Sequence, residues 1–242
     1  MNTQDFEWNG YNWSVSMEGG RLIHPQYTHQ WYDKECVNIL SDGTLELTVK
    51  QHPTVIEHWD GFTYYPQIGV GTVMSKESFG VGKFSALIQL PKGCNLWPSF
   101  WLTGEKTWPP EIDICEAWSN DRGSYFRLFI PQFPYLSPSW KTTTNFHYGD
   151  SEETHEWAGT RNISIFKQCH NPSDNFIRYE VERHYNRLVY KVNGKTVRTI
   201  DNVEYKLGLK PMVVIFNIWT ESMDFTYQSP MLIKEFKFKS YL

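Results

Sequence analysis

Three acidic residues fall within six positions of the chain, separated by bulky apolar residues, in the stretch Glu111-Ile112-Asp113-Ile114-Cys115-Glu116. β-Branched isoleucine at alternate positions favours an extended strand. On a regular strand Glu111 and Asp113 share a face, whereas Glu116 points to the opposite face. One inserted residue, a β-bulge, returns Glu116 to the face of the other two. We therefore predict a bulged strand with its isoleucines in the core and its acids toward a cleft.

Three like charges on one face are a poor structural choice, because they repel one another and the pKa of at least one must rise. Such a group of carboxyl groups suits catalysis by acids and bases. Retaining glycoside hydrolysis needs two carboxyl groups about 5–5.5 Å apart, one ionised and one protonated. A third acid between them can tune both. A cation site and a solvated edge strand are the alternatives that the strand pattern by itself leaves open.

The 242 residues fit one large all-β domain, and we expect a single catalytic domain over residues 1–242. Many short strands with turn signals, and no lasting helical period, predict a β-sandwich. Aromatic residues make up 17% of the chain, with 11 Trp and 14 Tyr. We expect some of these rings to stack on sugars in a cleft and the others to pack in the core.

Charge and apolar patterning exclude several kinds of partner. The net charge is −4, with acidic and basic residues interspersed, so no basic stripe indicates nucleic-acid binding. No apolar run approaches the length of a membrane span. The four cysteines (Cys36, Cys94, Cys115 and Cys169) are widely spaced and contain no CxxC pair, which argues against a cysteine zinc site. We expect a buried thiol at Cys115, and a disulfide among the others stays open.

The expected strands alternate with recognisable turns. Asp42-Gly43 and Asn193-Gly194 predict tight hairpins. We expect a loop over residues 53–66, a strand over 125–130 that runs back beside the acid strand, and a long irregular stretch over 132–157. Further strands are expected over 70–74, 83–90, 96–102, 162–166, 176–183, 187–192, 196–200, 212–220 and 233–240.

The amino end, Met1-Asn2-Thr3-Gln4-Asp5-Phe6, has no signal-peptide pattern. We expect a secreted, periplasmic or cell-surface protein whose leader is absent from this sequence, with a cytoplasmic location left open. We also expect a monomer.

At the acid strand the sequence resembles glycoside hydrolase family 16, which carries the bulged pattern E-x-D-x-x-E. Further stretches are similar to the family in order and spacing. They are Phe79-Gly80-Val81-Gly82-Lys83-Phe84, Leu90-Pro91-Lys92-Gly93, Leu96-Trp97-Pro98-Ser99-Phe100-Trp101-Leu102, Phe146-His147-Tyr148-Gly149, the hairpin around Asn193-Gly194, and Asn217-Ile218-Trp219. Together they cover roughly residues 70–220, and their joint occurrence is far more specific than any one motif.

The resemblance implies a jelly roll of two curved antiparallel sheets with a cleft across the concave face. It implies an endo-acting, retaining hydrolase of a β-linked polysaccharide. By position it makes Glu111 the nucleophile, Glu116 the acid/base and Asp113 the assisting carboxylate between them. We expect no required cofactor and leave a structural calcium ion open.

Two departures keep the branch of the family open. Pro110 stands where many members have glycine, and Trp219-Thr220-Glu221-Ser222 replaces a glycine-rich stretch of the β-1,3-glucanase branch. Branches that act on agar, porphyran or carrageenan share the bulged motif and vary in these loops. We therefore favour a galactan, sulfated or not, as the substrate. A β-1,3 or mixed-linkage glucanase and a non-catalytic carbohydrate-binding sandwich are the alternatives.

Several residues beyond the three acids are candidates for substrate binding. Trp97, Trp101 and Trp118 have the parity of the acid-facing side, and His147 belongs to a matched motif. An arginine fork would suit sulfate oxygens. The full set of substrate-binding candidates is Trp97, Trp101, Trp118, His147, Trp219, Trp59 and Arg127.

Overall fold

The computed structural model describes residues 5–17, 21–24, 26–58, 60–118, 141–149, 151–159, 161–163, 171–203 and 210–241. Within these ranges the only helix is a short 3-10 turn, η2 (Lys34–Cys36), and the other regular elements are β-strands. The predicted all-β class is therefore confirmed. In the same ranges no helix has the length and apolar character needed to cross a membrane.

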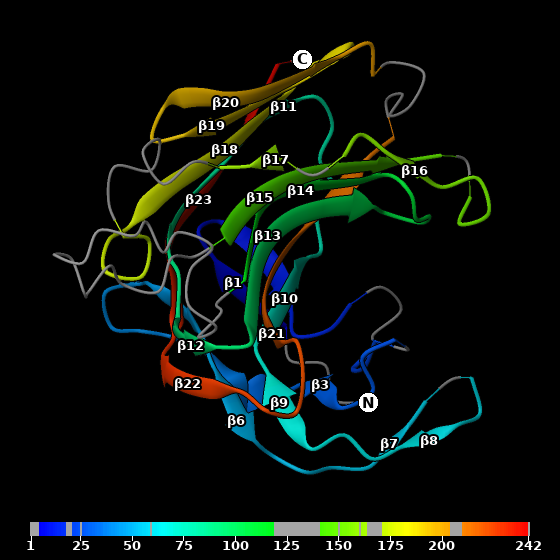
Figure 1. Ribbon diagram of the computed structural model, residues 1–242, viewed down its shortest axis with the longest axis vertical. Coiled ribbons are helices and arrows are strands. Elements are labelled where there is room, and N and C mark those ends of the chain that lie inside the picture. Colours follow the sequence, from blue (N-terminus) through cyan, green and yellow to red (C-terminus); the bar gives the residue numbers. More distant parts are fainter. Residues whose placement is uncertain are drawn as a thin grey trace, which may run out of the picture.

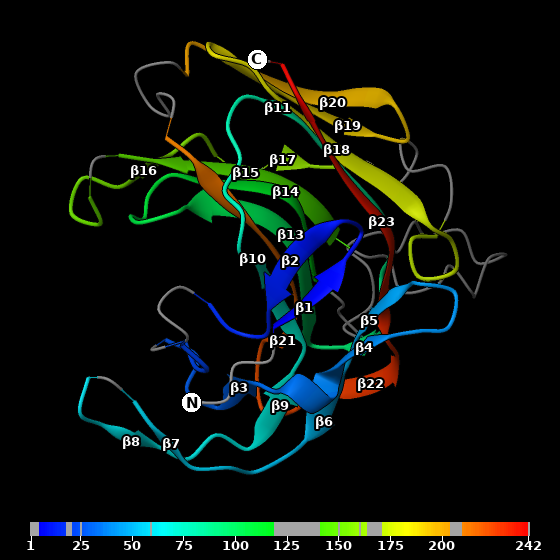
Figure 2. The same ribbon diagram turned by 180° about the vertical axis from the view of Figure 1, so that it is seen from behind.

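Two curved antiparallel sheets form a sandwich (Figures 1 and 2). The first sheet has the order β1-β2-β10-β21-β13-β14-β15-β16, with β17 beside β15. Its strands are β1 (Asp5–Trp8), β2 (Tyr11–Ser14), β10 (Thr72–Ser75), β13 (Leu96–Gly104), β14 (Glu111–Trp118), β15 (Lys141–Tyr148), β16 (Glu156–Trp157), β17 (Arg161–Asn162) and β21 (Met212–Thr220).

The second sheet has the order β20-β19-β18-β11-β23-β5-β4. Its strands are β4 (Val37–Ile39), β5 (Leu45–Leu47), β11 (Gly82–Gln89), β18 (Ile177–Arg183), β19 (Arg187–Val192), β20 (Lys195–Asp201) and β23 (Met231–Ser240). Both predicted hairpins belong to this sheet. Asn193 and Gly194 have φ of 48° and 75°, as a two-residue turn between β19 and β20 requires.

Shorter ribbons extend the sandwich. β3 (Gln30–Tyr32), β6 (Val49–Gln51) and β9 (Ile68–Val70) form one small sheet, β12 (Lys92–Cys94) pairs with β22 (Thr226–Ser229), and β7 (Ile56–Glu57) pairs with β8 (Thr63–Tyr64). The last pair corrects the predicted loop over residues 53–66, which contains a short hairpin. In Figure 1 this hairpin lies at the lower right and β16 at the upper right of the molecule.

Aromatic rings join the two sheets in the core. Phe100 of β13 stacks on Phe216 of β21 with centroids 4.7 Å apart, and Phe236 of β23 in the other sheet meets Phe216 edge-on at 5.9 Å. All three are almost fully buried. Burial of side chains of this size is the main favourable term for the fold.

One prediction about the first sheet was wrong. Residues 132–157 were expected to be irregular, but Lys141–Tyr148 is the regular strand β15, which pairs directly with the acid strand β14. The consecutive threonines Thr142, Thr143 and Thr144 are β-branched and nearly inaccessible, so they favour a strand although they are polar. The strand predicted over 125–130 lies outside the described residues.

Gly82, in the Phe79-Gly80-Val81-Gly82 motif, tests how closely β11 lies against β23. A Cβ on Gly82 would lie 2.5 Å from the backbone oxygen of Lys239 and 2.5 Å from the ring of Phe238, both on β23. We expect Gly82→Ala to lower the free energy of unfolding by about 1–3 kcal/mol through overpacking, as measured by urea denaturation.

Gly80→Ala is the matched control, because a Cβ there has no atom within 4 Å. Its effect should stay within about 0.5 kcal/mol. Equal stabilities for the two variants would mean that β11 and β23 are not as closely apposed as described.

Candidate active site

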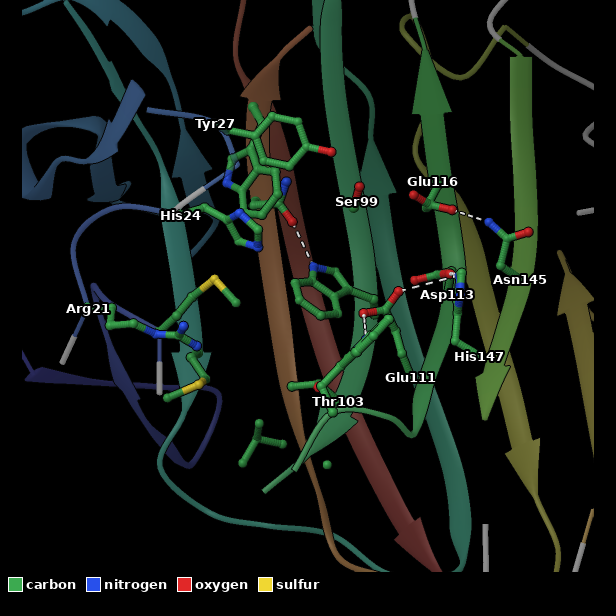
Figure 3. Close-up of a pocket in the computed structure, with 18 of the residues that line it drawn as sticks. Arg21, His24, Tyr27, Ser99, Thr103, Glu111, Asp113, Glu116, Asn145 and His147 are labelled. Atoms are coloured by element: carbon green, nitrogen blue, oxygen red, sulfur yellow. Dashed lines mark hydrogen bonds and ion pairs between the residues drawn. The ribbon is translucent and has the colours of Figure 1, made fainter. Parts of the chain in front are cut away.

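The acid strand carries the predicted bulge. On β13, Trp101 lies opposite Asp113 and the next residue back, Phe100, lies opposite Cys115, so Ile114 is the extra residue on β14. The pairing of β14 with β15 shifts at the same place. Because the bulge restores the facing of Glu116, the three carboxyl groups point to the same side of the sheet (Figure 3).

The three acids lie at the floor of a cleft of about 1130 Å³ that crosses the strands of the first sheet. Asp113 is 3% exposed and Glu116 8%, and the side chain of Glu111 is 19% exposed. The cleft extends over Ser14 of β2, Met74 of β10, Asn217 of β21, Ser99 of β13, Asn145 of β15 and Trp157 of β16. A cleft that crosses so many strands can accept an extended chain.

Burial governs the proton affinity of these acids. It raises the pKa of Glu111 and of Asp113 well above the ordinary values, and the negative charges of neighbouring acids raise both further. Burial also raises the pKa of Glu116, although hydrogen bonds from Asn145 and Trp97 oppose this effect. The cleft therefore favours retention of protons on this group of acids at a pH where exposed carboxyls are ionised.

Each outer acid receives an indole hydrogen bond. Trp108 Nε1 donates to Glu111 Oε2 at 2.9 Å. Trp97 Nε1 donates to Glu116 Oε1 at 3.2 Å, and the Asn145 amide donates to Glu116 Oε2. Such donors orient a carboxyl group and favour its ionised form.

His147 lies beside Glu111 and Asp113. It is the residue of β15 that pairs with Glu111 of β14. Its Nε2 is 3.6 Å from Glu111 Oε1 and 3.5 Å from Asp113 Oδ2. Its Nδ1 is 2.8 Å from Nε2 of His155, which lies on the segment between β15 and β16. The ring of His155 packs against Trp108 at 4.6 Å. Two histidines and a tryptophan thus enclose one end of the group of acids.

The predicted aromatic residues gather on the other side of the acids. Trp97 stacks on Trp118 with centroids 5.9 Å apart and meets Trp219 edge-on at 5.7 Å. Trp219 is 5% exposed, and its indole nitrogen donates a hydrogen bond to the Thr72 hydroxyl. Most of its surface is therefore packed against other residues. The cleft is lined by five of the predicted substrate-binding residues, Trp97, Trp101, Trp118, Trp219 and His147. Trp59 and Arg127 lie outside the described residues.

Trp101 is 9% exposed, and its indole donates to Asn217 Oδ1 at 2.8 Å. It therefore contributes to the floor of the cleft more than to an open stacking face. Trp97 and Trp118 are each partly exposed, and they are the better placed of the predicted tryptophans to meet a sugar ring.

The second sheet supports the strand behind the acids. Tyr190 on β19 donates to the backbone oxygen of Asn145 at 2.8 Å, and Arg198 on β20 donates to that of Thr144 at 2.7 Å. The guanidinium of Arg198 also lies 5.8 Å from the centroid of the Tyr190 ring. Contacts of this kind fix the backbone from which Asn145 and His147 reach the acids.

Among the cleft residues that sequence reasoning missed are Trp108, Asn145, His155 and Tyr27. Asn145 had a usable signal, since it stands two residues before His147 and shares its strand face. Tyr27 had none, because it reaches Trp97 and Trp219 from a distant segment, with centroids 5.6 Å from each.

The family model for glycosyl hydrolases family 16 matches residues 24–234. The chain belongs to this family. The similarity to the family thus extends over most of this chain, including the segment with Tyr27 and the strands of the second sheet.

Solved structures share the family 16 fold. A structure described among endo-acting O-glycanases of the human gut microbiota that initiate mucin breakdown superposes with a TM-score of 0.71 at 21% identity, covering 99% of this chain and 87% of its own. The LamA catalytic domain from Zobellia galactanivorans superposes with a TM-score of 0.65 at 20% identity, covering 98% of this chain and 89% of its own. At these identities the likeness concerns the fold alone.

A curated relative is similar over a shorter stretch. The galactan endo-beta-1,3-galactanase of Flammulina velutipes is 37% identical over 79 residues, which are 31% of this chain and 30% of the relative. The family 16 chain thus spans less than a third of the length of that protein.

The raised pKa of Asp113 makes a prediction about stability. When the folded-state pKa of an acid exceeds its unfolded value, the folded state binds more protons, so stability falls as pH rises through the folded pKa. Asp113→Asn removes this ionisation. We expect a higher melting temperature than wild type at pH 8, with the difference shrinking toward pH 4, as measured by differential scanning calorimetry.

Asp42→Asn is the control, because Asp42 is exposed in a hairpin turn and its pKa is lowered by hydrogen bonds from Thr44. The Asp42→Asn variant should show no rise in melting temperature over wild type at pH 8. If Asp113→Asn behaved in the same way, burial would not be the dominant influence on Asp113.

Proposed function

We propose that this chain is an endo-acting, retaining glycoside hydrolase that cleaves a β-linked polysaccharide. The main support is the bulged strand that directs three carboxyl groups into a cleft running across the first sheet. Membership of family 16 supports the same proposal. A carbohydrate-binding module has no need to bury three like charges together.

In the first half of the reaction, Glu111 acts as the nucleophile and Glu116 as the general acid. The Glu111 carboxylate forms a bond to the anomeric carbon while the bond from that carbon to the glycosidic oxygen breaks. The proton of Glu116 moves to the departing oxygen. Burial favours the protonated form of Glu116. Burial raises the pKa of Glu111 as well, and the hydrogen bond from Trp108 opposes that rise and so favours the carboxylate that attacks.

In the second half, Glu116 acts as a base. It removes a proton from water, whose oxygen attacks the anomeric carbon and releases Glu111. Two inversions leave the product in the β configuration. Asp113 lies between the two glutamates on the strand, and burial raises its pKa. In its protonated form it can donate a hydrogen bond to Glu111 and stabilise the charge of that residue.

Within this activity we favour a galactan as the substrate, sulfated or not. The similarity to a galactan endo-beta-1,3-galactanase supports a galactan as the substrate. Arg21 and Lys76 line the cleft at the β10 side, where guanidinium and ammonium groups suit the oxygens of a sulfate. Because such a polymer cannot enter a cell intact, we also propose that the protein acts outside the cytoplasm.

Replacement of the acids tests the mechanism. We expect Glu111→Gln to lower kcat by several orders of magnitude with substrate binding retained, because the amide preserves shape but cannot attack. Glu116→Gln should be severe with natural polysaccharide and milder with an aryl glycoside, whose leaving group needs little protonation. The measurement is release of reducing ends from agarose, porphyran, carrageenan, laminarin and lichenan.

Glu57→Gln, on the exposed hairpin β7–β8, is the control and should leave kcat unchanged. Proton NMR of early hydrolysis should show the β-anomer first. An α-anomer first would contradict the retaining mechanism. Binding to the panel without any new reducing ends would favour the carbohydrate-binding alternative, and cleavage restricted to laminarin or lichenan would replace the galactan by a glucan.

The stacked pair Trp97 and Trp118 makes a prediction about affinity. Trp118→Ala should weaken oligosaccharide binding by about 1–3 kcal/mol, by analogy with bases stacked on aromatic side chains. Calorimetric titration in the Glu111→Gln background separates binding from turnover. Tyr185→Ala, which removes an exposed ring outside the cleft lining, is the control. Unchanged binding by a folded Trp118→Ala variant would assign Trp118 to packing.

A further inference from the structure

We propose that Glu111, Asp113 and His147 form a binding site for a transition-metal ion, with zinc as the favoured ion. His147 Nε2 lies 3.6 Å from Glu111 Oε1 and 3.5 Å from Asp113 Oδ2, and the three donor atoms all lie within 4.8 Å of one another. Zinc ligands about 2.0–2.2 Å from a tetrahedral ion are about 3.3–3.6 Å apart. The two nitrogen–oxygen distances match that spacing with no rearrangement.

An unsatisfied oxygen atom independently indicates a ligand at this place. Asp113 is 3% exposed, and its Oδ2 has no hydrogen-bond donor among the described residues. A buried carboxyl oxygen without a hydrogen-bond partner carries the cost of its lost hydration. That oxygen is the one that faces His147 Nε2, so an ion held between them would satisfy it (Figure 3).

The second histidine prepares the first for metal binding. His147 Nδ1 is 2.8 Å from His155 Nε2. In the tautomer whose Nδ1 donates to His155, the lone pair of His147 lies on Nε2, toward the carboxylates. Partners that hold a ligating imidazole in this way are a regular feature of metal sites.

The donor set favours zinc over calcium or magnesium. One imidazole and two carboxylates suit a borderline ion with four ligands, whereas calcium takes six to eight oxygens and magnesium an octahedron that is rich in water. The side chains of Glu111 and His147 are 19% and 20% exposed, so the fourth position of the ion would face the open cleft.

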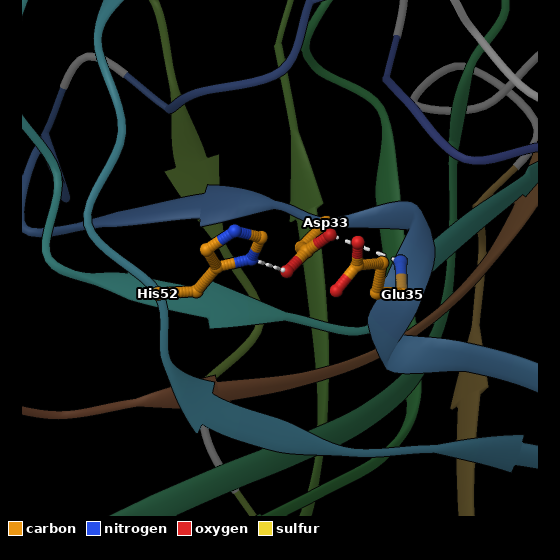
Figure 4. Close-up of side chains that lie close together, drawn as sticks. All are labelled: Asp33, Glu35 and His52. Atoms are coloured by element: carbon orange, nitrogen blue, oxygen red, sulfur yellow. Dashed lines mark hydrogen bonds and ion pairs between the residues drawn. The ribbon is translucent and has the colours of Figure 1, made fainter.

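A second group of metal-binding residue types provides an internal comparison. Asp33, Glu35 and His52 also lie together (Figure 4). There the Lys50 ammonium lies 3.5 Å from Asp33 and 2.5 Å from Glu35, and His52 Nδ1 is 2.5 Å from Asp33 Oδ2. Because the chain supplies its own cation and satisfies Asp33, we expect no metal ion at this second group.

Zinc at the first site would inhibit the hydrolase, and this part of the inference rests on the proposed function. The ion would share the electron pairs of Glu111 and Asp113, so Glu111 could no longer attack an anomeric carbon. It would also occupy the floor of the cleft that the substrate needs. Inhibition should therefore be competitive and reversed by EDTA.

Calorimetric titration of the tag-free, EDTA-treated chain with zinc chloride tests the site without any substrate. We expect one equivalent of zinc per chain. His147→Ala and Glu111→Gln should each weaken binding at least tenfold, and His155→Phe should do so about 10–100-fold through loss of the imidazole partner. His52→Ala and His184→Ala should bind as wild type does, and calcium chloride should not compete.

The spectrum of bound Co²⁺ provides a second measurement that does not depend on heat signals. Intense visible bands that require His147 would support a four-coordinate site. The proposal is overturned if wild type binds no zinc, if folded His147→Ala binds it equally well, or if His52→Ala abolishes binding. Zinc binding at His147 by a chain that cleaves no polysaccharide would refute the proposed function alone, and cleavage by a chain that binds no zinc would refute the metal site alone.

Discussion

A single unpaired residue, Ile114, determines the chemistry of this molecule. Without it the alternation of β14 would send Glu116 into the core of the sandwich, beneath Asp113 and Glu111. With it, the three carboxyl groups share one side of the sheet, while Ile112 and Cys115 still pack inward. The regular strands β13 and β15 hold the bulge from both sides, so the irregularity is confined to one position and its geometry is well defined.

The arrangement has an energetic cost that the rest of the sandwich must offset. Three acids are enclosed together, and burial makes their ionisation unfavourable. The donors around them come from different elements: Trp97 from β13, Asn145 from β15, and Trp108 from the segment between β13 and β14. Tyr190 and Arg198 in turn hold β15 from the opposite sheet. The interior thus positions the acids by hydrogen bonds that continue from one sheet to the other.

Local patterns in the sequence were enough to predict part of the fold and part of the site. Alternation and the spacing of the acids predicted the bulge, and the Asp-Gly and Asn-Gly pairs predicted the hairpins, because these features depend on neighbouring residues. The strand β15 escaped prediction because its threonines are polar, although the fold leaves them almost inaccessible. Tyr27 escaped because it reaches the cleft through contacts from a distant segment. The apolar residues Ile233, Phe236 and Phe238 of β23 do not alternate regularly. The cause is again non-local, a register shift opposite Leu87 and Ile88 of β11.

The order of the strands has a consequence for how the chain reaches this state during synthesis. β21 lies between β10 and β13, and β23 lies between β11 and β5, so both sheets have a gap until the last part of the chain is available. A nascent chain that ends before Met212 would expose unpaired edges of β10 and β13, which are the kind of edge that recruits other strands. Non-local pairing of this kind is slow to form. A ribosome-bound chain that has delivered β10 and β13 but not β21 would therefore hold the first sheet open at these two edges, although β13, β14 and β15 can already pair around the acids.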